Sequence, residues 1–140
     1  MLTFEPFRKE HLTYLSDKEA AVLHATATVV ELERHPAFTG RDCAGRIVGC
    51  AGLHPIWWPG RWNAWAFLED ATGPHMLQIT RFVRLVLDSY PVPRVEAHVL
   101  ADFPQGYRFA EILGFKLETP EPMLKWLPDG SSVYQFSKVR

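Results

Sequence analysis

The chain has 140 residues, of which 47% are apolar, 13% aromatic and 22% charged. This length fits one domain spanning residues 1–140, and the apolar content supports a packed core and excludes the low hydrophobicity of disordered chains. With 15 basic and 16 acidic side chains the formal net charge is -1, so no overall field attracts nucleic acid or a membrane surface, and neither is expected as a partner.

The first residues, MLTFEPFRKE, carry charges where a secretory signal needs an apolar block, which predicts a soluble, cytoplasmic protein. The apolar runs are far shorter than the roughly 20 residues that a transmembrane helix needs. We expect Cys43 and Cys50 to be free thiols, because disulfides are rare in a reducing cytoplasm. The six histidines are scattered and neither cysteine forms a ligand pair, so no metal site is expected.

Apolar spacing and turn residues divide the chain into strands and helices. The predicted strands are Leu2–Phe7, Ala37–Asp42, Arg46–His54, Trp62–Glu69, Arg94–Leu100, a short one beginning at Phe115, Met123–Leu127 and Ser132–Val139. The predicted helices are Asp17–Arg34, a long amphipathic helix from Pro74 to the residues before Pro91, and Pro104–Leu113. The first helix has the Ser-x-x-Glu spacing of a capping box at its start, in Ser16 and Glu19.

A strand, a helix and a strand follow one another between Trp62 and Leu100, and such a unit predicts parallel pairing. Turn residues at Cys43–Gly45 and Pro128–Gly130 predict antiparallel hairpins on either side. The sequence therefore predicts an α/β fold with a central mixed sheet flanked by helices.

The turn in front of the long helix is a candidate anion site. Proline at a first helical position wastes no hydrogen bond, so Pro74 would leave the amides of His75, Met76 and Leu77 pointing outward at the positive end of the helix dipole. Gly73 would let a ligand approach the backbone closely. Glycine followed by proline is also an ordinary way to begin a helix, and both interpretations stay open.

The order of these segments resembles the GNAT superfamily of acyl-CoA-dependent N-acetyltransferases. The resemblance lies in the strand WNAWAFLE, the loop DATGPH, the long helix, the strand VEAHV and the segment FPQGYRFAEILGFKLE. The chain is also similar to small, divergent GNAT-like proteins of bacteriophages. The resemblance implies a GNAT-like acyl-CoA N-acyltransferase fold, acetyl-CoA as the cofactor, an amine of a small molecule or protein as the acceptor, and the host cytoplasm as the location if a phage encodes it.

By this resemblance, loop amides hold the pyrophosphate of coenzyme A and the strand before the loop pairs with the pantetheine arm. The implied cofactor-binding residues are Trp65, Ala66, Phe67, Ala71, Thr72, Gly73, Pro74, His75, Met76 and Phe103. Three positions depart from the family pattern: Asp70 brings a negative charge, His75 replaces a small residue, and Phe103 stands where an asparagine is frequent.

Two residues are candidates for catalysis. His98 matches a position at which some relatives carry their base, and its ordinary pKa of about 6.5 suits that role. The family's usual tyrosine acid falls on Ala110, and Tyr107 lies one turn earlier on the same helical face, so Tyr107 either replaces that acid or packs against the sheet. A lone histidine on a strand is also often structural, and that reading of His98 stays open.

Loss of the usual tyrosine leaves an alternative function. The chain would then be a catalytically inactive GNAT-like protein with a binding or structural role, in a virion or as an inhibitor of a host factor. Trp57 and Trp58, if exposed at a hairpin tip, would offer a contact for another subunit, so a homodimer is one predicted assembly.

Overall fold

The computed structural model describes residues 1–13, 28–57 and 60–140. Within these residues the strands form a mixed seven-stranded sheet in the order β1-β2-β3-β4-β5-β7-β6, which confirms the predicted fold class. The strands are β1 (Thr3–Pro6), β2 (Ala37–Arg41), β3 (Ile47–Trp57), β4 (Arg61–Leu68), β5 (Arg94–Leu100), β6 (Lys116–Leu117) and β7 (Val133–Val139).

The helices are η1 (Lys9–Leu12), α2 (Val29–Glu33), η2 (Asp70–His75), α3 (Met76–Ser89) and α4 (Pro104–Ile112), where η marks a 3-10 helix. None of the helices in these described ranges is long and apolar enough to cross a bilayer. The chain forms two compact units, Met1–His54 with Ala64–Ser89 and Pro55–Asn63 with Tyr90–Arg140, and each unit has its own packing.

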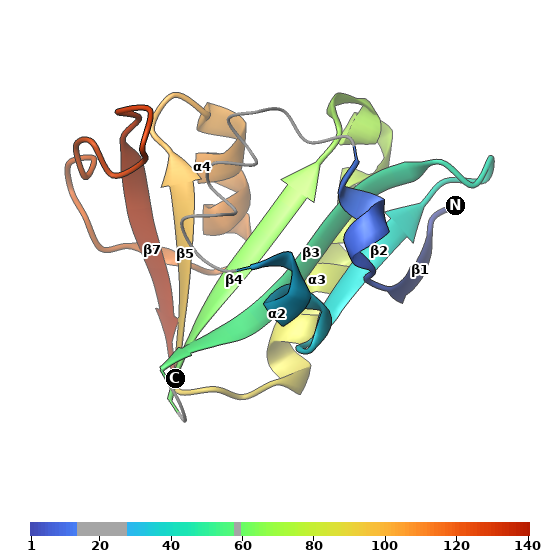
Figure 1. Ribbon diagram of the computed structural model, residues 1–140, viewed down its shortest axis with the longest axis horizontal. Helices are drawn as coiled ribbons and strands as arrows, with labels where there is room; N and C mark the ends of the chain where they lie inside the picture. The colour runs from blue at the N-terminus through green and yellow to red at the C-terminus, as the bar shows by residue number, and fades with distance from the viewer. Residues whose placement is uncertain (14–27, 58–59) are drawn as a thin grey trace. The chain divides into compact units, whose positions relative to one another are not determined.

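In the first unit, α3 lies against one face of β1 and β2 (Figure 1). Phe82 of α3 stacks on Phe4 with ring centroids 3.9 Å apart, and it meets Phe38 edge-on at 5.2 Å. Each such aromatic pair contributes about 0.5–1.5 kcal/mol beyond the area it buries. The predicted hairpin is confirmed, because β2 pairs with both β1 and β3 in antiparallel register.

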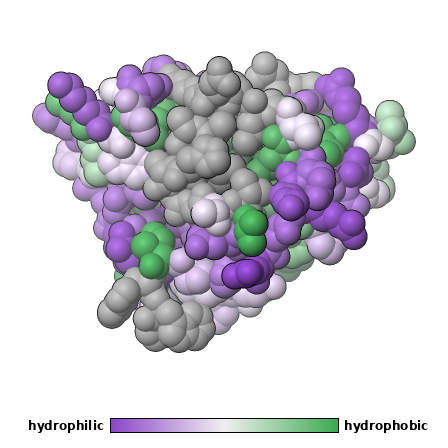
Figure 2. Space-filling model, viewed as in Figure 1, coloured by the Kyte–Doolittle hydropathy of each residue, from purple (hydrophilic) through white to green (hydrophobic). Residues whose placement is uncertain are grey.

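The other face of this unit carries η1, α2 and an apolar cluster. The cluster contains Phe7, Leu32, Cys50, Trp65 and Phe67, all less than a tenth exposed. Phe7 meets the ring of Trp65 edge-on at 5.2 Å. The outer surface over η1 is hydrophilic (Figure 2), and Leu12 of η1 packs against the cluster.

The helix predicted from Asp17 to Arg34 is only partly testable, because residues 14–27, with the capping box at Ser16 and Glu19, lie outside the described ranges. The described part contradicts a continuous helix. Thr28 is extended (φ -83°, ψ 153°), and its hydroxyl accepts a hydrogen bond of 3.3 Å from the Glu31 amide. An extended residue whose side chain caps the next turn begins a new helix, and that helix is α2.

In the second unit, β5 lies between β4 and β7. It pairs in parallel with β4 over Arg94–Glu96, as predicted for the central strand-helix-strand unit, and antiparallel with β7 along its whole length. Helix α4 covers the apolar face. Tyr107 of α4 meets the rings of Tyr134 and Phe136 edge-on at 5.3 and 5.0 Å.

The strand predicted at Met123–Leu127 is wrong. Met123 forms a single antiparallel bridge with Val133, and the chain then turns. Lys125 adopts a left-handed conformation (φ 51°), which the extended backbone of a strand cannot contain. The turn lets the following residue, Trp126, stack on the ring of His98.

Candidate active site

Strand β5 alternates apolar and polar side chains, so its two faces differ in chemistry. Glu96 and His98 lie on the polar face. The register places Asn63 of β4 opposite Glu96, and Gln135 of β7 opposite His98. Because paired residues share a face, polar side chains from three strands meet on this side of the second unit.

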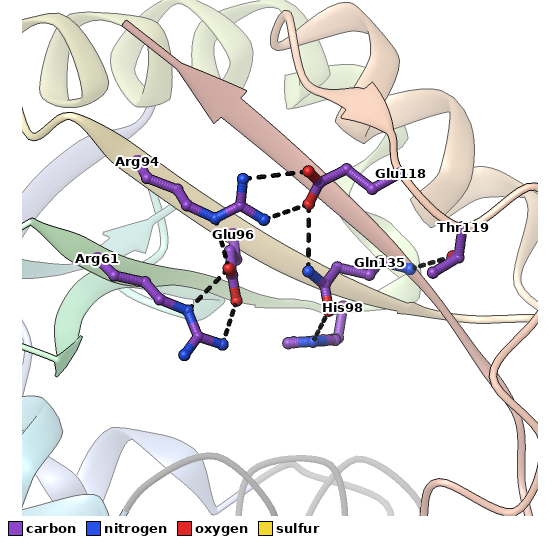
Figure 3. A network of polar contacts seen from close by, with 7 residues as sticks. All are labelled: Arg61, Arg94, Glu96, His98, Glu118, Thr119 and Gln135. Carbon is purple, nitrogen blue, oxygen red and sulfur yellow. Dashed lines mark hydrogen bonds and ion pairs between the residues drawn. The ribbon is translucent and has the colours of Figure 1, made fainter.

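Glu96 is the buried centre of this group, with 1% of its surface exposed. Arg61 donates to its two carboxylate oxygens at 2.8 and 2.9 Å, and Arg94 Nε donates at 2.7 Å (Figure 3). Burial alone would raise the pKa of Glu96, but the hydrogen bonds from Arg61 and Arg94 outweigh it and hold the pKa below its ordinary value. The carboxylate is therefore ionised at neutral pH and fully engaged.

The network continues from Arg94 to Glu118, whose carboxylate accepts at 3.1 Å and in a second, closer contact. These hydrogen bonds lower the pKa of Glu118, and burial opposes them only in part. Gln135 Nε2 donates to Glu118 at 3.2 Å, and its backbone amide donates to the Thr119 hydroxyl at 2.9 Å (Figure 3). Gln135 is therefore held at both its backbone and its side chain.

His98 ends the network. Its Nε2 lies 3.3 Å from Gln135 Oε1, and its ring stacks on Trp126 with centroids 4.6 Å apart. Its Nδ1 is buried and has no hydrogen-bond partner among residues 1–13, 28–57 and 60–140. Burial lowers the pKa of His98, against a smaller opposing effect of the Gln135 hydrogen bond. A neutral imidazole with one unused nitrogen can accept a proton.

Asn63 presents a second unused acceptor on the same face. Only 3% of its surface is exposed, and its Oδ1 has no hydrogen-bond partner in the described part of the chain. A buried polar atom without a partner costs about 1–3 kcal/mol, so it calls for an explanation in function or in a bound molecule. Asn63 and His98 thus offer two acceptors on neighbouring strands.

Tyr107 lies on the other side of the sheet. Its ring packs between α4 and β7, whereas His98 is on the polar face. The two predicted catalytic side chains therefore do not form one cluster. Ala110, at the position of the family's usual tyrosine, is 5% exposed, and Phe103 is 49% exposed at the N-cap of α4 without a side-chain capping bond.

The predicted cofactor residues of β4 belong to the first unit. Trp65 and Phe67 are 8% and 7% exposed and direct their rings into the apolar cluster, while Ala66 is exposed. Their side chains are committed to packing. Only their backbone groups are suited to meet an extended ligand, as the resemblance implies.

The predicted helix start at Pro74 is wrong. A 3-10 helix, η2, occupies Asp70–His75 with Pro74 inside it, and α3 begins at Met76. The Met76 amide, expected to be unpaired, donates to the carbonyl of Gly73. Because η2 is a 3-10 helix that runs directly into α3, and its hydrogen bonds join residues three apart, the amides without an intrahelical partner lie at its start, at Asp70 and Ala71.

Gly73 is exposed, and a Cβ built on it would meet no atom within 4 Å. It is not among the residues with positive φ. Neither backbone conformation nor crowding by the protein therefore requires glycine at this position. The backbone at Gly73 is therefore open to solvent, and another molecule could approach it closely.

Sequence reasoning identified only His98 of the polar network. It missed the buried Asn63 and the other network residues, which are Arg61, Arg94, Glu96, Glu118, Thr119 and Gln135. A glutamate within an apolar strand signals a paired charge, because carboxylates are rarely buried alone. Its partner Arg61 lies 35 positions away. Only the register of β4 against β5 identifies that partner.

No protein-family model and no curated protein matches the chain. Solved structures do. An acetyltransferase of the GNAT family from Bacillus anthracis superimposes with a TM-score of 0.69 at 14% identity, covering 99% of this chain and 94% of the other. Spermidine/spermine N-acetyltransferase SpeG from Vibrio cholerae gives 0.65 at 14%, covering 99% and 92%. The chain therefore has a GNAT-like fold, as the resemblance implied.

Proposed function

We propose that the protein is an acetyl-CoA-dependent N-acetyltransferase that acts on an amine of a small molecule or protein. The observation that carries this proposal is the state of His98 within a GNAT-like fold: a neutral imidazole whose buried Nδ1 has no hydrogen-bond partner among the residues that the structure describes. Amine acetylation needs such a base, because the attacking nitrogen must lose a proton.

Acetyl-CoA, when bound, supplies the acetyl group as an activated thioester. His98 accepts the proton that the amine nitrogen loses as its bond to the acetyl carbon forms and the carbon-sulfur bond breaks. The Tyr107 hydroxyl then donates a proton to the departing thiolate. His98 lies on the part of β5 that extends past its pairing with β4, from Ala97 to Leu100.

The cofactor contacts that we propose lie in two places in the first unit. The start of η2, at Asp70–Thr72, and the open Gly73 fit a pyrophosphate, with Pro74, His75 and Met76 completing the helical turn beneath it. The backbone of Trp65–Phe67 fits the pantetheine arm.

A non-catalytic binding protein with the same fold is the second candidate. Two observations favour it: alanine occupies the usual acid position, and the ring of Tyr107 is packed against Tyr134 and Phe136. Such a protein would keep the fold without turning over acetyl-CoA.

Two measurements on the full chain separate these functions. Thermal unfolding with and without acetyl-CoA tests binding, and release of free thiol in the presence of a panel of polyamines, amino acids and peptides tests transfer. We expect a rise in Tm and amine-dependent thiol release. A rise in Tm without thiol release from any amine would support the binding protein. The absence of both responses would exclude both acetyl-CoA binding and acetyl transfer.

A further inference from the structure

The orientation of Glu118 is set by Arg94. An ionised carboxylate accepts hydrogen bonds and donates none, and the contacts with Arg94 keep Glu118 ionised at neutral pH. Any neighbour that bonds to Glu118 must therefore present a donor. Gln135, which bonds to Glu118, must therefore act as a donor toward it.

Gln135 meets Glu118 with its NH₂ group at 3.2 Å. An amide has its donors on one side and its acceptor on the other, so Oε1 is turned to His98 Nε2, 3.3 Å away. The reversed amide would set its oxygen against the carboxylate and lose that hydrogen bond. Glu118 thus fixes the orientation of the Gln135 amide, so that its Oε1 faces His98.

A carbonyl oxygen accepts, so the imidazole must carry its proton on Nε2. We propose that Gln135, oriented by Glu118, is a positioning residue that holds His98 in the Nε2-H tautomer and so makes Nδ1 the proton acceptor of the active site. The tautomer follows from the hydrogen bonds alone, and only its chemical use rests on the proposed function. The Nδ1 atom is also the buried one without a partner in the described part of the chain.

The charged groups near His98 balance one another. Glu96 favours the imidazolium and Arg61 opposes it, while Glu118 is screened from the ring by Gln135 and neutralised by Arg94. A neutral amide orients the ring without the strong rise in pKa that a carboxylate in its place would cause. The ring can therefore take the amine proton on Nδ1 while its Nε2 proton stays bonded to Gln135 Oε1, and after transfer it releases the proton from Nδ1 to water.

The tautomer can be measured by long-range ¹H-¹⁵N NMR on the full chain labelled with ¹⁵N-histidine, at neutral pH and without cofactor or amine. His98→Ala identifies the signals among the six histidines. We expect a protonated Nε2 and an unprotonated Nδ1 in the wild type. The other tautomer would overturn the proposal, whatever the outcome of the transfer assay.

Three variants test the positioning role. Gln135→Leu removes the acceptor, and Glu118→Gln lets the Gln135 amide reverse, so both should give a mixture of tautomers and lower kcat/KM about 10-fold or more. Gln135→Glu sets a carboxylate on Nε2 and should raise the pKa of His98 by about one unit. Leucine and glutamate therefore have opposite effects on the pKa of His98, a pattern that general loosening of the fold would not produce.

Thr119→Val is the matched control, because it removes a hydrogen bond to the Gln135 backbone and leaves the amide side chain in place. It should keep the wild-type tautomer and pKa. If Gln135→Leu fails to fold, the His98 tautomer in Glu118→Gln, at the more exposed end of the network, provides the test. An unchanged tautomer in Glu118→Gln, or an unchanged His98 pKa in Gln135→Glu, would overturn the proposal, even if the protein proves to be an active acetyltransferase.

Discussion

Arg61 and Glu96 lie on neighbouring parallel strands and join through two hydrogen bonds, Nε to Oε2 at 2.8 Å and Nη2 to Oε1 at 2.9 Å. The register pairs Arg61 with Arg94 and Asn63 with Glu96, so the guanidinium reaches diagonally across the sheet. This geometry assigns Glu96 a structural role. A carboxylate held by two arginines has a lowered pKa and is a poor base, so the proposed mechanism assigns proton transfer to His98 and not to Glu96.

Replacing Glu96 by glutamine should destabilise the fold. The neutral amide cannot accept from both arginines on two charged oxygens, and loss of buried charge-assisted hydrogen bonds costs about 2–3 kcal/mol. Urea unfolding at pH 7 would measure this loss. Glu118→Gln, at a partly exposed ion pair, should cost no more than about 1 kcal/mol and serves as the control.

The cost of Glu96→Gln should also depend on pH. The pKa of Glu96 in the folded protein is lowered below its ordinary value of 4.5. The ionised carboxylate therefore contributes fully to the free energy of unfolding above pH 4.5, and this contribution is lost as the pH falls through the pKa of the folded protein. The difference between wild type and variant should therefore shrink in acid. A difference that stays constant from pH 7 to pH 3 would show that the carboxylate charge contributes nothing.

The pH dependence of transfer should report His98. Burial lowers its pKa below the ordinary 6.5, and the base must be neutral to act. The acidic limb of kcat/KM should thus lie below pH 6.5, with the rate level between that limb and neutral pH. His98→Ala should lower transfer about 10²-fold or more, remove this limb and leave the Kd for acetyl-CoA unchanged. A limb above pH 6.5, or wild-type turnover by the variant, would remove His98 from the mechanism.

Substitutions at Gly73 should separate ligand binding from stability. Alanine fits the open backbone and should leave the free protein as stable or up to about 1 kcal/mol more stable, yet weaken coenzyme A binding roughly tenfold by calorimetry. Glutamate should abolish the rise in Tm with acetyl-CoA, since it adds bulk and negative charge.

Gly130 provides a matched control for Gly73. It is equally open but left-handed (φ 87°), so Gly130→Ala should destabilise by about 1 kcal/mol and leave coenzyme A affinity unchanged. The reverse result, with affinity lowered at Gly130 and not at Gly73, would count against the proposed pyrophosphate site.

Two variants of Tyr107 distinguish packing from acid catalysis. Tyr107→Phe keeps the ring against Tyr134 and Phe136, so stability should change by less than about 1 kcal/mol, while loss of the hydroxyl should lower kcat by about 10²-fold. Tyr107→Ala should cost about 2–4 kcal/mol by removing the ring. Wild-type kcat in the phenylalanine variant would leave Tyr107 with packing alone.

Asn63→Leu should raise stability and lower activity. Leucine has a similar shape and removes a buried acceptor that has no partner in the described chain, which should stabilise the protein by about 1–2 kcal/mol in urea unfolding. The same variant should reduce kcat/KM if the Asn63 oxygen meets the amine beside His98. A destabilised variant would instead assign the amide a structural role.

The sequence by itself determined the elements whose ends are marked by local chemistry. The predicted strand Arg94–Leu100 coincides with β5, and the predicted helix Pro104–Leu113 differs from α4 by one residue. Proline cannot continue a helix upstream and Gly114 takes a left-handed conformation at its end (φ 91°), so both boundaries depend on neighbouring residues alone. The order of the elements followed from the same signals, and its likeness to GNAT proteins was a resemblance.

Only the tertiary structure decided the chemistry of the candidate site. Local spacing gives no register between strands, and register is what sets Arg61 on Glu96 and Gln135 beside His98. Contacts with distant segments likewise determine that Trp126 turns over His98 where a strand was predicted. A side chain's pKa and tautomer depend on which remote groups surround it, and that information exists only once the chain has folded.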